Sequence, residues 1–197
     1  MAKPKKSKWV KKTLKLKPDH GWSSKPGYNV FAADRGAVRF DFPESWLIRP
    51  GEKGSIKFHD RTPPDDNCTL EMSIFYLPDI DWSGLPLSLL VEDITKNDKR
   101  GVISQGEIIT FQRPRADVAW REVRFIDPNE QREAHSRIAV ARWSNIQPLL
   151  TFDFWADDAP KLEPVWDEIM SSLVLGDYVE DPTQRLPFDP EPPFGTS

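Results

Sequence analysis

Apolar and polar residues alternate along several separate stretches of the 197-residue chain, and this alternation constrains the fold more than any other sequence feature. A period of two residues places one set of side chains on each face of a strand, as in strands buried on one side. In the first half of the chain the alternation covers residues 38–42, 56–58 and 70–76, with a weaker stretch at 28–32. Turn residues at 43–46 and 49–52 separate the first stretches, so we expect an antiparallel meander.

Four further stretches of strand-like sequence occupy the second half of the chain. They cover residues 103–113, 117–126, 136–144 and 149–155. Their spacing is even, and turn residues such as Pro114 and Pro128 fall between them. This favours antiparallel hairpins over parallel strands joined by crossover helices. Together with the first half, the pattern predicts a central antiparallel sheet of about six or seven strands.

Two segments change to the spacing of an amphipathic helix. The first follows Ser83, the expected N-cap, and ends before Gly101, with apolar positions at Leu87, Leu90, Val91 and Ile94. The second begins near Asp157 or Asp158 and ends at Gly176, with an apolar stripe at Leu162, Val165, Trp166, Ile169, Met170 and Leu173. A sheet buries its apolar face against helices, so we expect an α+β fold with helices packed on the sheet as an α/β/α sandwich.

Charge divides the chain into three parts. The net charge is −4, yet residues 1–17 contain eight lysines and no acidic residue. Residues 177–197 hold five acidic residues, one arginine and five prolines. We therefore expect a basic N-terminal arm at 1–27, a single α+β domain at 28–176, and an acidic, proline-rich C-terminal tail at 177–197.

The cellular compartment follows from what the basic start lacks. Cys68 is the single cysteine, which excludes an internal disulfide. The lysines are not followed by the apolar run of a signal peptide, and no stretch reaches the 18 apolar residues that a membrane span needs. The sequence predicts a cytoplasmic protein with no transmembrane segment.

Three segments resemble the PsbP-like family. They are residues 40–46 (Phe-Asp-Phe-Pro-Glu-Ser-Trp), residues 149–155, and residues 159–173, which end in Ile-Met-Ser-Ser-Leu. The family includes PsbP, a Ran-binding nuclear import factor and bacterial DcrB-like proteins, and the resemblance covers about residues 36–176. It implies a central antiparallel sheet between helices, no common catalytic site, and members that bind other proteins. The lysine-rich start and the acidic tail have no counterpart in the family, so no family binding residue is carried over to this chain.

Few residues point to chemistry. The three histidines, His20, His59 and His135, lie far apart, without the spacing of metal ligands, and we predict no metal and no cofactor. Phosphate-binding and nucleophile-elbow motifs are absent. A cleft near His59, Asp60 and Cys68 is the alternative, because a thiol nucleophile needs a neighbouring base. A buried structural cysteine is the interpretation that we favour, so an enzyme is the weaker class.

Tryptophan and arginine side chains are the candidates for binding another protein, because these two residue types dominate interface energetics. The candidates are Trp120, Arg121, Arg124, Arg142, Trp143 and Trp155. The arginines lie on neighbouring expected strands, so cross-strand ion pairs on a solvated sheet face are the other interpretation. The sequence thus predicts a non-catalytic protein-binding module, such as an assembly factor, adaptor or chaperone.

The lysine-rich arm offers a second possible binding element. Its candidate residues are Lys5, Lys6, Lys8, Trp9, Lys11 and Lys12. Such a cluster can contact RNA, anionic lipid or an acidic protein through its charge. A disordered solubilising arm is the alternative, because blocks of like charge repel one another.

Overall fold

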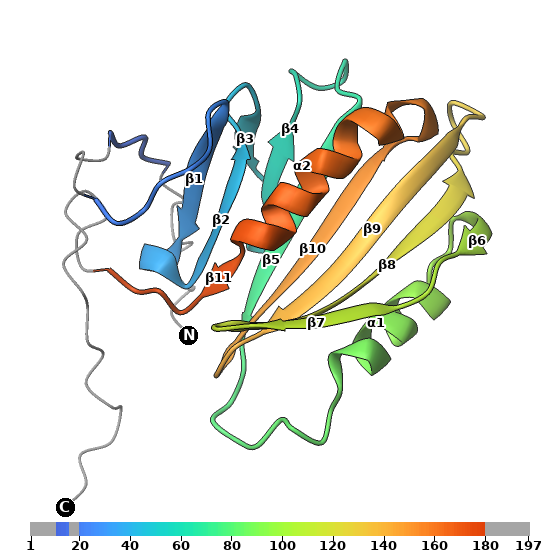
Figure 1. Cartoon of the computed structure of the whole chain (residues 1–197). Helices are drawn as coiled ribbons and strands as arrows, with labels where there is room; N and C mark the ends of the chain where they lie inside the picture. Colours follow the sequence, from blue (N-terminus) through green and yellow to red (C-terminus); the bar gives the residue numbers. More distant parts are fainter. Residues whose placement is uncertain (1–10, 16–19, 180–197) are drawn as a thin grey trace, which may run out of the picture.

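The computed structural model describes residues 11–15 and 20–179. Within these residues the chain forms two α-helices and eleven strands (Figure 1). The helices are α1 (Leu87–Lys96) and α2 (Ala159–Ser172). The strands are β1 (Tyr28–Ala33), β2 (Val38–Pro43), β3 (Leu47–Pro50), β4 (Ile56–His59), β5 (Cys68–Tyr76), β6 (Gly101–Gln105), β7 (Ile109–Arg113), β8 (Ala116–Ile126), β9 (Glu133–Arg142), β10 (Ile146–Trp155) and β11 (Val174–Leu175).

The strands form two antiparallel sheets. The large sheet has eight strands in the order β3-β4-β5-β10-β9-β8-β6, with β7 also paired to β8. The small sheet has the order β1-β2-β11 and lies beside the β3–β5 side of the large sheet (Figure 1). The predicted α+β class is confirmed, and the large sheet has one strand more than the six or seven expected.

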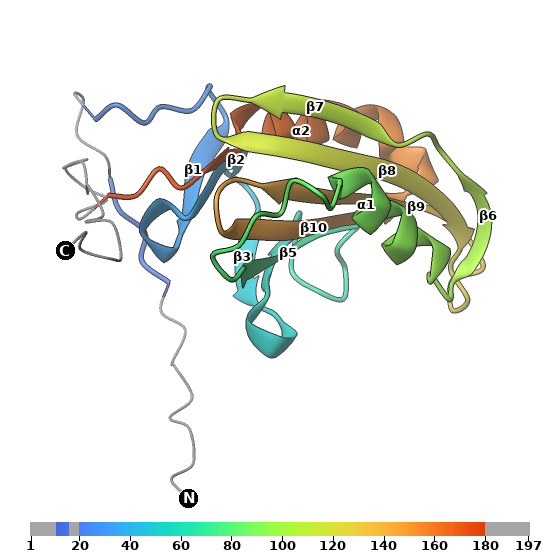
Figure 2. The ribbon, with the colours of Figure 1, turned by 90° about the horizontal axis from the view of Figure 1, so that it is seen from below.

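The two helices cover opposite faces of the large sheet (Figure 2). On the face that we call the α2 face, Trp166 stacks on Phe152 at a ring-centroid distance of 6.0 Å. On the opposite α1 face, Val91 packs against Ala119 of β8 and Val140 of β9 in a separate small cluster. The apolar stripes expected of both helices therefore face the sheet, as the sandwich prediction requires.

The predicted meander is wrong in its first strand. Strand β2 pairs with β1 and β11 in the small sheet, while β4 pairs with β3, in a stretch that the sequence suggested was partly turn. Phe31 and Phe40 of the small sheet lie 4.9 Å and 5.4 Å, between ring centroids, from Phe58 of the large sheet. The alternation in residues 38–42 thus buries an aromatic face against a second sheet instead of extending the first.

Three predicted boundaries also shift. The stretch 103–113 splits into β6 and β7 around Gly106, whose backbone N–H donates to Glu122 at 2.9 Å. Helix α1 begins after Pro86 with no side-chain cap, so Ser83 is not its N-cap. Helix α2 ends at Ser172, before Gly176, because Val174–Leu175 extends to pair with β2.

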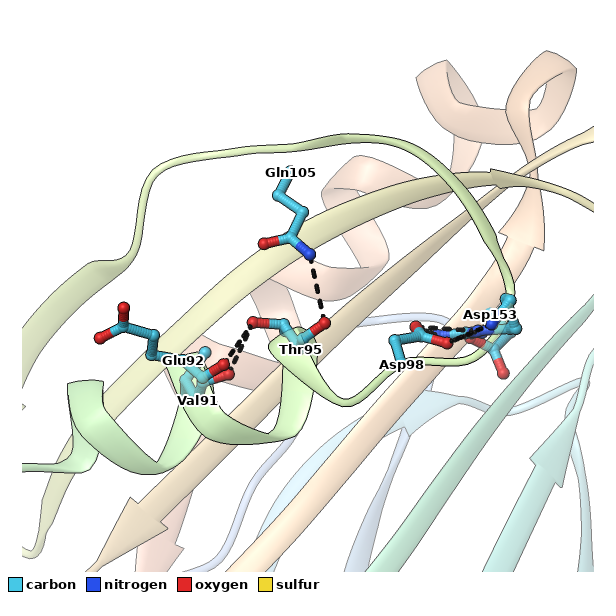
Figure 3. A network of polar contacts seen from close by, with 7 residues as sticks. Val91, Glu92, Thr95, Asp98, Gln105 and Asp153 are labelled. Carbon is cyan, nitrogen blue, oxygen red and sulfur yellow. Dashed lines mark hydrogen bonds and ion pairs between the residues drawn. The ribbon is translucent and has the colours of Figure 1, made fainter.

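Polar contacts hold the C-terminal end of α1 against the sheet (Figure 3). Gln105 of β6 donates through Nε2 to the carbonyl of Thr95 at 3.2 Å. Arg121 of β8 donates through Nη1 to Thr95 Oγ1 at 3.1 Å. After the helix, Arg100 bridges Asp98 and Asp153 at 2.6 Å and 3.2 Å. These contacts tie α1, β6 and the centre of the large sheet into one unit.

Candidate functional site

The six tryptophans and arginines singled out from the sequence lie on both faces of the large sheet. Trp120 packs on Trp166 of α2, whereas its neighbour Arg121 contacts Thr95 of α1. Alternation along β8 places Arg124 on the α2 face. Alternation along β10 places Trp155, with the guanidinium of Arg132 over its ring, on the α1 face. Arg142 binds the loop before α1, and Trp143 lies in the turn between β9 and β10. The structure therefore does not gather the six into one patch.

An ion-pair cluster lies on the α2 face, where the sequence suggested cross-strand pairs. Arg137 is buried and donates through Nε to Glu122 Oε2 at 2.9 Å. Its guanidinium carbon lies 5.5 Å from the ring centroid of Trp120. Arg124 pairs with the other oxygen of Glu122 at 3.3 Å. The pairs exist, but the one involving Arg137 is enclosed beside α2 instead of lying on a solvated face.

Arg142 holds the loop at residues 77–86 in place. Its Nη1 donates to the carbonyls of Trp82 and Leu85 at 3.1 Å and 2.9 Å. Its Nε and Nη2 both donate to Gln147 Oε1. Burial lowers the pKa of Arg142, and the negative charge of Asp117 opposes that shift. Arg142 thus links the loop to the sheet through neutral acceptors.

A hollow of about 380 Å³ lies beside this arginine. The loop, the start of α1, and strands β7, β8 and β9 all contribute to its wall. Lining residues include Trp82, Leu85, Thr110, Phe111, Val118 and Arg142. The wall is mixed, because Ser83, Gln112 and Asp117 also line it. The donors of Arg142 are directed at main-chain and amide oxygens.

Large apolar side chains are exposed at the same end of the large sheet. Phe75, Tyr76, Ile80 and Trp143 are each between 43% and 62% exposed. The backbone N–H of Leu77 donates to Asn145 at 2.7 Å, which joins the end of β5 to the β9–β10 turn. We call these four residues and the hollow the hairpin-end surface. Of the four, only Trp143 was predicted from the sequence, although the apolar run from Ile74 to Leu77 breaks the alternation and indicates two apolar faces.

The structure places His59, Asp60 and Cys68 at the β4–β5 connection, but it does not join the imidazole to the thiol. His59 pairs with Thr69 and contacts its side chain, so Cys68, one residue away, points to the opposite face of β5. His59 Nδ1 lies 2.8 Å from Asp66 Oδ2, and Asp60 Oδ1 accepts the backbone N–H of Cys68 at 3.3 Å. Cys68 itself is buried, and burial raises the pKa of its thiol. The thiolate that nucleophilic catalysis needs is therefore disfavoured. The contacts brace the connection between the strands, and the described part of the chain holds no group of three or more metal-ligating side chains.

The Cys68 thiol is expected to resist alkylation in the folded protein. In native buffer at pH 8, iodoacetamide should modify Cys68 at least about a hundredfold more slowly than in denaturant, because the thiol is both buried and protonated. Mass spectrometry of timed samples measures the two rates. Native labelling as fast as labelling in denaturant would show an accessible thiolate and revive the catalytic alternative.

A buried carboxyl lies between β2 and α2. Asp41 is 5% exposed and its Oδ1 has no hydrogen-bond partner among the described residues. Its backbone N–H donates to Ser172 Oγ at 2.8 Å, while nearby Lys25 and Glu168 pair at 2.6 Å. Burial raises the pKa of Asp41 to about 6, against the opposing positive charge of Arg39.

This carboxyl is expected to make folding pH-dependent. The unfolded chain releases the proton near pH 3.9 and the folded protein near pH 6, so the stability falls as pH rises between these values. Asp41→Asn cannot ionise, and the decline should be smaller in this variant. Urea unfolding at pH 4 and pH 7 measures it. Equal pH dependence in both proteins would contradict the assignment to Asp41.

The lysine arm lies mostly outside the described residues. Lys5, Lys6, Lys8 and Trp9 fall outside them, whereas Lys11 and Lys12 are described and exposed. At the other boundary of the predicted domain, Trp22 is buried and donates through Nε1 to Asp177 Oδ2 at 2.9 Å. The predicted division into arm, domain and tail stays a prediction. None of the helices in the described ranges is long and apolar enough to cross a membrane.

Comparison with proteins of known structure identifies the fold. The cyanobacterial PsbP (CyanoP) of Synechocystis sp. PCC 6803 is 15% identical with a TM-score of 0.54, over 79% of this chain and 98% of CyanoP. The Ran-binding protein Mog1p of Saccharomyces cerevisiae is 11% identical with a TM-score of 0.50, over 75% of this chain and 95% of Mog1p. LpqN of Mycobacterium tuberculosis is 13% identical with a TM-score of 0.53, over 75% of this chain and 90% of LpqN. The predicted PsbP-like fold is therefore confirmed.

Comparison at the level of sequence identifies the family. The chain is 50% identical over 191 residues to the uncharacterised protein Alr1449 of Nostoc sp. PCC 7120, which covers 95% of this chain and 99% of that protein. The family model named Alr1449 matches residues 29–179, which span both sheets and both helices. The chain therefore belongs to the Alr1449 family.

Proposed function

We propose that this protein is a non-catalytic protein-binding module, acting as an adaptor, assembly factor or chaperone through its hairpin-end surface. One observation carries the proposal: Phe75, Tyr76, Ile80 and Trp143 expose large apolar side chains at the same end of the large sheet as the hollow. Several exposed apolar side chains at one end of a sheet are typical of interaction sites. Tryptophan, tyrosine and arginine are also the residue types that contribute most to binding energy.

The rigidity of this surface supports binding. Arg142 fixes the loop at Trp82 and Leu85, and Leu77 is hydrogen-bonded to the β9–β10 turn. A preformed surface loses little conformational entropy when a partner binds, so more of the contact energy appears as affinity. The mixed wall of the hollow suits a protruding partner side chain that is apolar with a polar end.

The fold is compatible with this role. Mog1p, described as Ran-binding, has the same fold, so the fold is known to support protein recognition. Fold alone does not transfer a partner, and the proposal rests on the surface of this chain. We place the protein in the cytoplasm as part of the proposal, since a single buried thiol suits a reducing compartment.

Affinity capture tests the function. The full chain is immobilised as wild type, as Phe75→Ser/Trp143→Ser, and as Ile103→Ser, a control that removes a similarly exposed side chain from β6. Soluble extract of the source organism is passed over each at low salt, and retained proteins are quantified by mass spectrometry. We expect a partner retained equally by wild type and control, and roughly tenfold less by the double variant.

Two outcomes contradict the proposal. One is that no protein is retained above background by the wild type. The other is that the same proteins are retained to the same extent by all three chains, which would place binding elsewhere. Circular dichroism of the variants checks that the substitutions leave the fold intact.

A further inference from the structure

The large sheet has an open edge at β7. Strand β7 pairs with β8 on one side, and within the described residues no strand pairs with its other side. Figure 2 shows β7 and β6 following one another along the outer rim of the sheet. Main-chain groups of successive residues in an antiparallel strand point alternately to its two sides, so every second residue of β7 leaves its N–H and C=O unpaired at this edge.

The edge lacks the usual protection against pairing. Soluble proteins discourage strand addition with lysine, proline or charges within an edge strand. Residues Ile109, Thr110, Phe111 and Gln112 contain none of these, and Ile109 is 46% exposed. Isoleucine, threonine and phenylalanine have high strand propensity. The two charges of the segment, Glu107 and Arg113, lie at its ends.

We propose that a second copy of this chain covers the edge, by antiparallel pairing of β7 with β7 about a two-fold axis at Thr110. In this register Ile109 of one copy lies opposite Phe111 of the second copy. Glu107 lies opposite Arg113 of the second copy, and symmetry repeats both pairs. The segment 107–113 is thus self-complementary, as an isologous interface requires.

The charges select this register. Among the described residues neither Glu107 nor Arg113 has an ion pair with an opposite charge, although both are exposed. Arg113 contacts only the neutral carbonyl of Ser171 and the ring of Phe111. An axis at Ile109 would place both charges opposite neutral residues. An axis at Phe111 would place Arg113 opposite Ile109, and Glu107 opposite Arg115, which already pairs with Asp177 at 3.6 Å. An axis at Thr110 places unlike charges opposite each other, which favours the pairing.

The main-chain geometry agrees with the same axis. Residues paired about Thr110 have the same parity, for example Ile109 with Phe111. The main-chain N–H and C=O groups that point away from β8 in one copy therefore face the corresponding groups of the second copy. Gln105 links β6 to α1, and Arg121 links β8 to α1. These hydrogen bonds hold rigid the part of the sheet edge formed by β6, next to β7.

Charge exchange tests the dimer. Sedimentation equilibrium of the full chain should show a monomer–dimer equilibrium with a dissociation constant of roughly 1–100 µM, as expected for a small interface. Glu107→Arg gives a chain with arginine at both ends of the segment, and Arg113→Glu gives one with glutamate at both. Each alone should dimerise roughly tenfold more weakly, because two attractive pairs become repulsive.

Mixing the two variants is the decisive measurement. A heterodimer of Glu107→Arg with Arg113→Glu restores unlike charges at both positions, so the mixture should associate about as tightly as wild type. Glu130→Arg, the same charge change in an exposed turn away from β7, should leave the constant unchanged. Thermal unfolding confirms that each variant is folded.

Three results would overturn the dimer. They are a wild type that stays monomeric up to about 1 mM, single variants that dimerise as tightly as wild type, and a mixture no tighter than its components. Neither variant alters a residue that lines the hollow or an exposed residue of the hairpin-end surface. Loss of dimerisation with retained partner capture therefore separates this inference from the proposed function.

Discussion

Replacing Trp166 with alanine is expected to lower the free energy of unfolding by about 3–5 kcal/mol. The side chain is 1% exposed at the centre of the interface between α2 and the large sheet. Its ring stacks on Phe152 and meets Trp120 edge-on at a centroid distance of 5.5 Å. Alanine removes these contacts and leaves a cavity that the rigid sheet cannot close. Since domains are typically stable by about 5–15 kcal/mol, the variant loses a large share of its stability.

Two further variants show that packing causes the loss. Trp166→Phe keeps an aromatic ring and removes Nε1, which has no hydrogen-bond partner among the described residues, so it should lose less than half as much stability. Trp143→Ala removes the same side chain where it is 43% exposed and should change stability by at most about 1 kcal/mol. Urea unfolding followed by circular dichroism measures all three. Equal losses at positions 166 and 143 would contradict this account of the core.

Trp166 belongs to an element that the sequence predicted well. Its stripe from Leu162 to Leu173 has a period of 3.6, and a helix of this kind is defined by local sequence. The long strands β8, β9 and β10 were also recognisable, because each spans at least ten residues, whereas the predicted stretch 103–113 is two strands of five residues. Pairing between strands that are distant in the chain cannot be predicted in this way, because local sequence does not encode it. Nothing in residues 38–42 says whether Phe40 packs in the same sheet as Phe58 or across from it, and the structure shows the latter.

The candidate binding residues illustrate the same limit. Arg121, Arg124 and Arg142 were grouped because they lie on neighbouring expected strands, yet an odd separation along one strand places Arg121 and Arg124 on opposite faces. Arg142 has acceptors in a loop about 60 residues earlier in the chain, a contact that no local pattern encodes. The hairpin-end surface unites residues from β5, the following loop and the β9–β10 turn, so it exists only once the sheet order is known.

The two proposed interfaces adjoin one another. Thr110 is the residue at the proposed two-fold axis, and it also lines the hollow. Dimerisation through β7 would therefore bring the hollows of the two copies together across the axis, as halves of one longer groove. A partner that spans both halves would bind the dimer more tightly than the monomer, because the second contact becomes intramolecular.

The second large effect is expected at the buried ion pair, where Arg137→Met should lower the free energy of unfolding by about 3 kcal/mol. The loss arises because Glu122 keeps its charge in an enclosed position without the donor that lies 2.9 Å away. Burial would raise the pKa of Glu122, but the hydrogen bond and charge of Arg137 outweigh it and hold the pKa below its usual value. Urea unfolding at pH 7 measures the change.

A double variant distinguishes the effect of an unpaired buried charge on Glu122 from the effect of lost packing around Arg137. In Glu122→Leu/Arg137→Met both charges are gone and apolar groups fill the space, so most of the stability should return. A double variant as unstable as Arg137→Met would show that packing, not charge, is responsible.

The pH dependence of the free energy of unfolding tests the ion pair between Arg137 and Glu122 independently. A carboxyl whose pKa is lowered by folding adds stability above its unfolded pKa of about 4.3, and this stability is lost as pH falls through the lower folded pKa. Arg137→Met removes the main cause of the lowering, so its stability should fall less than that of the wild type between pH 5 and pH 3. An unchanged acid dependence would mean that His135 and Arg124, which also contact Glu122, set that pKa instead of Arg137.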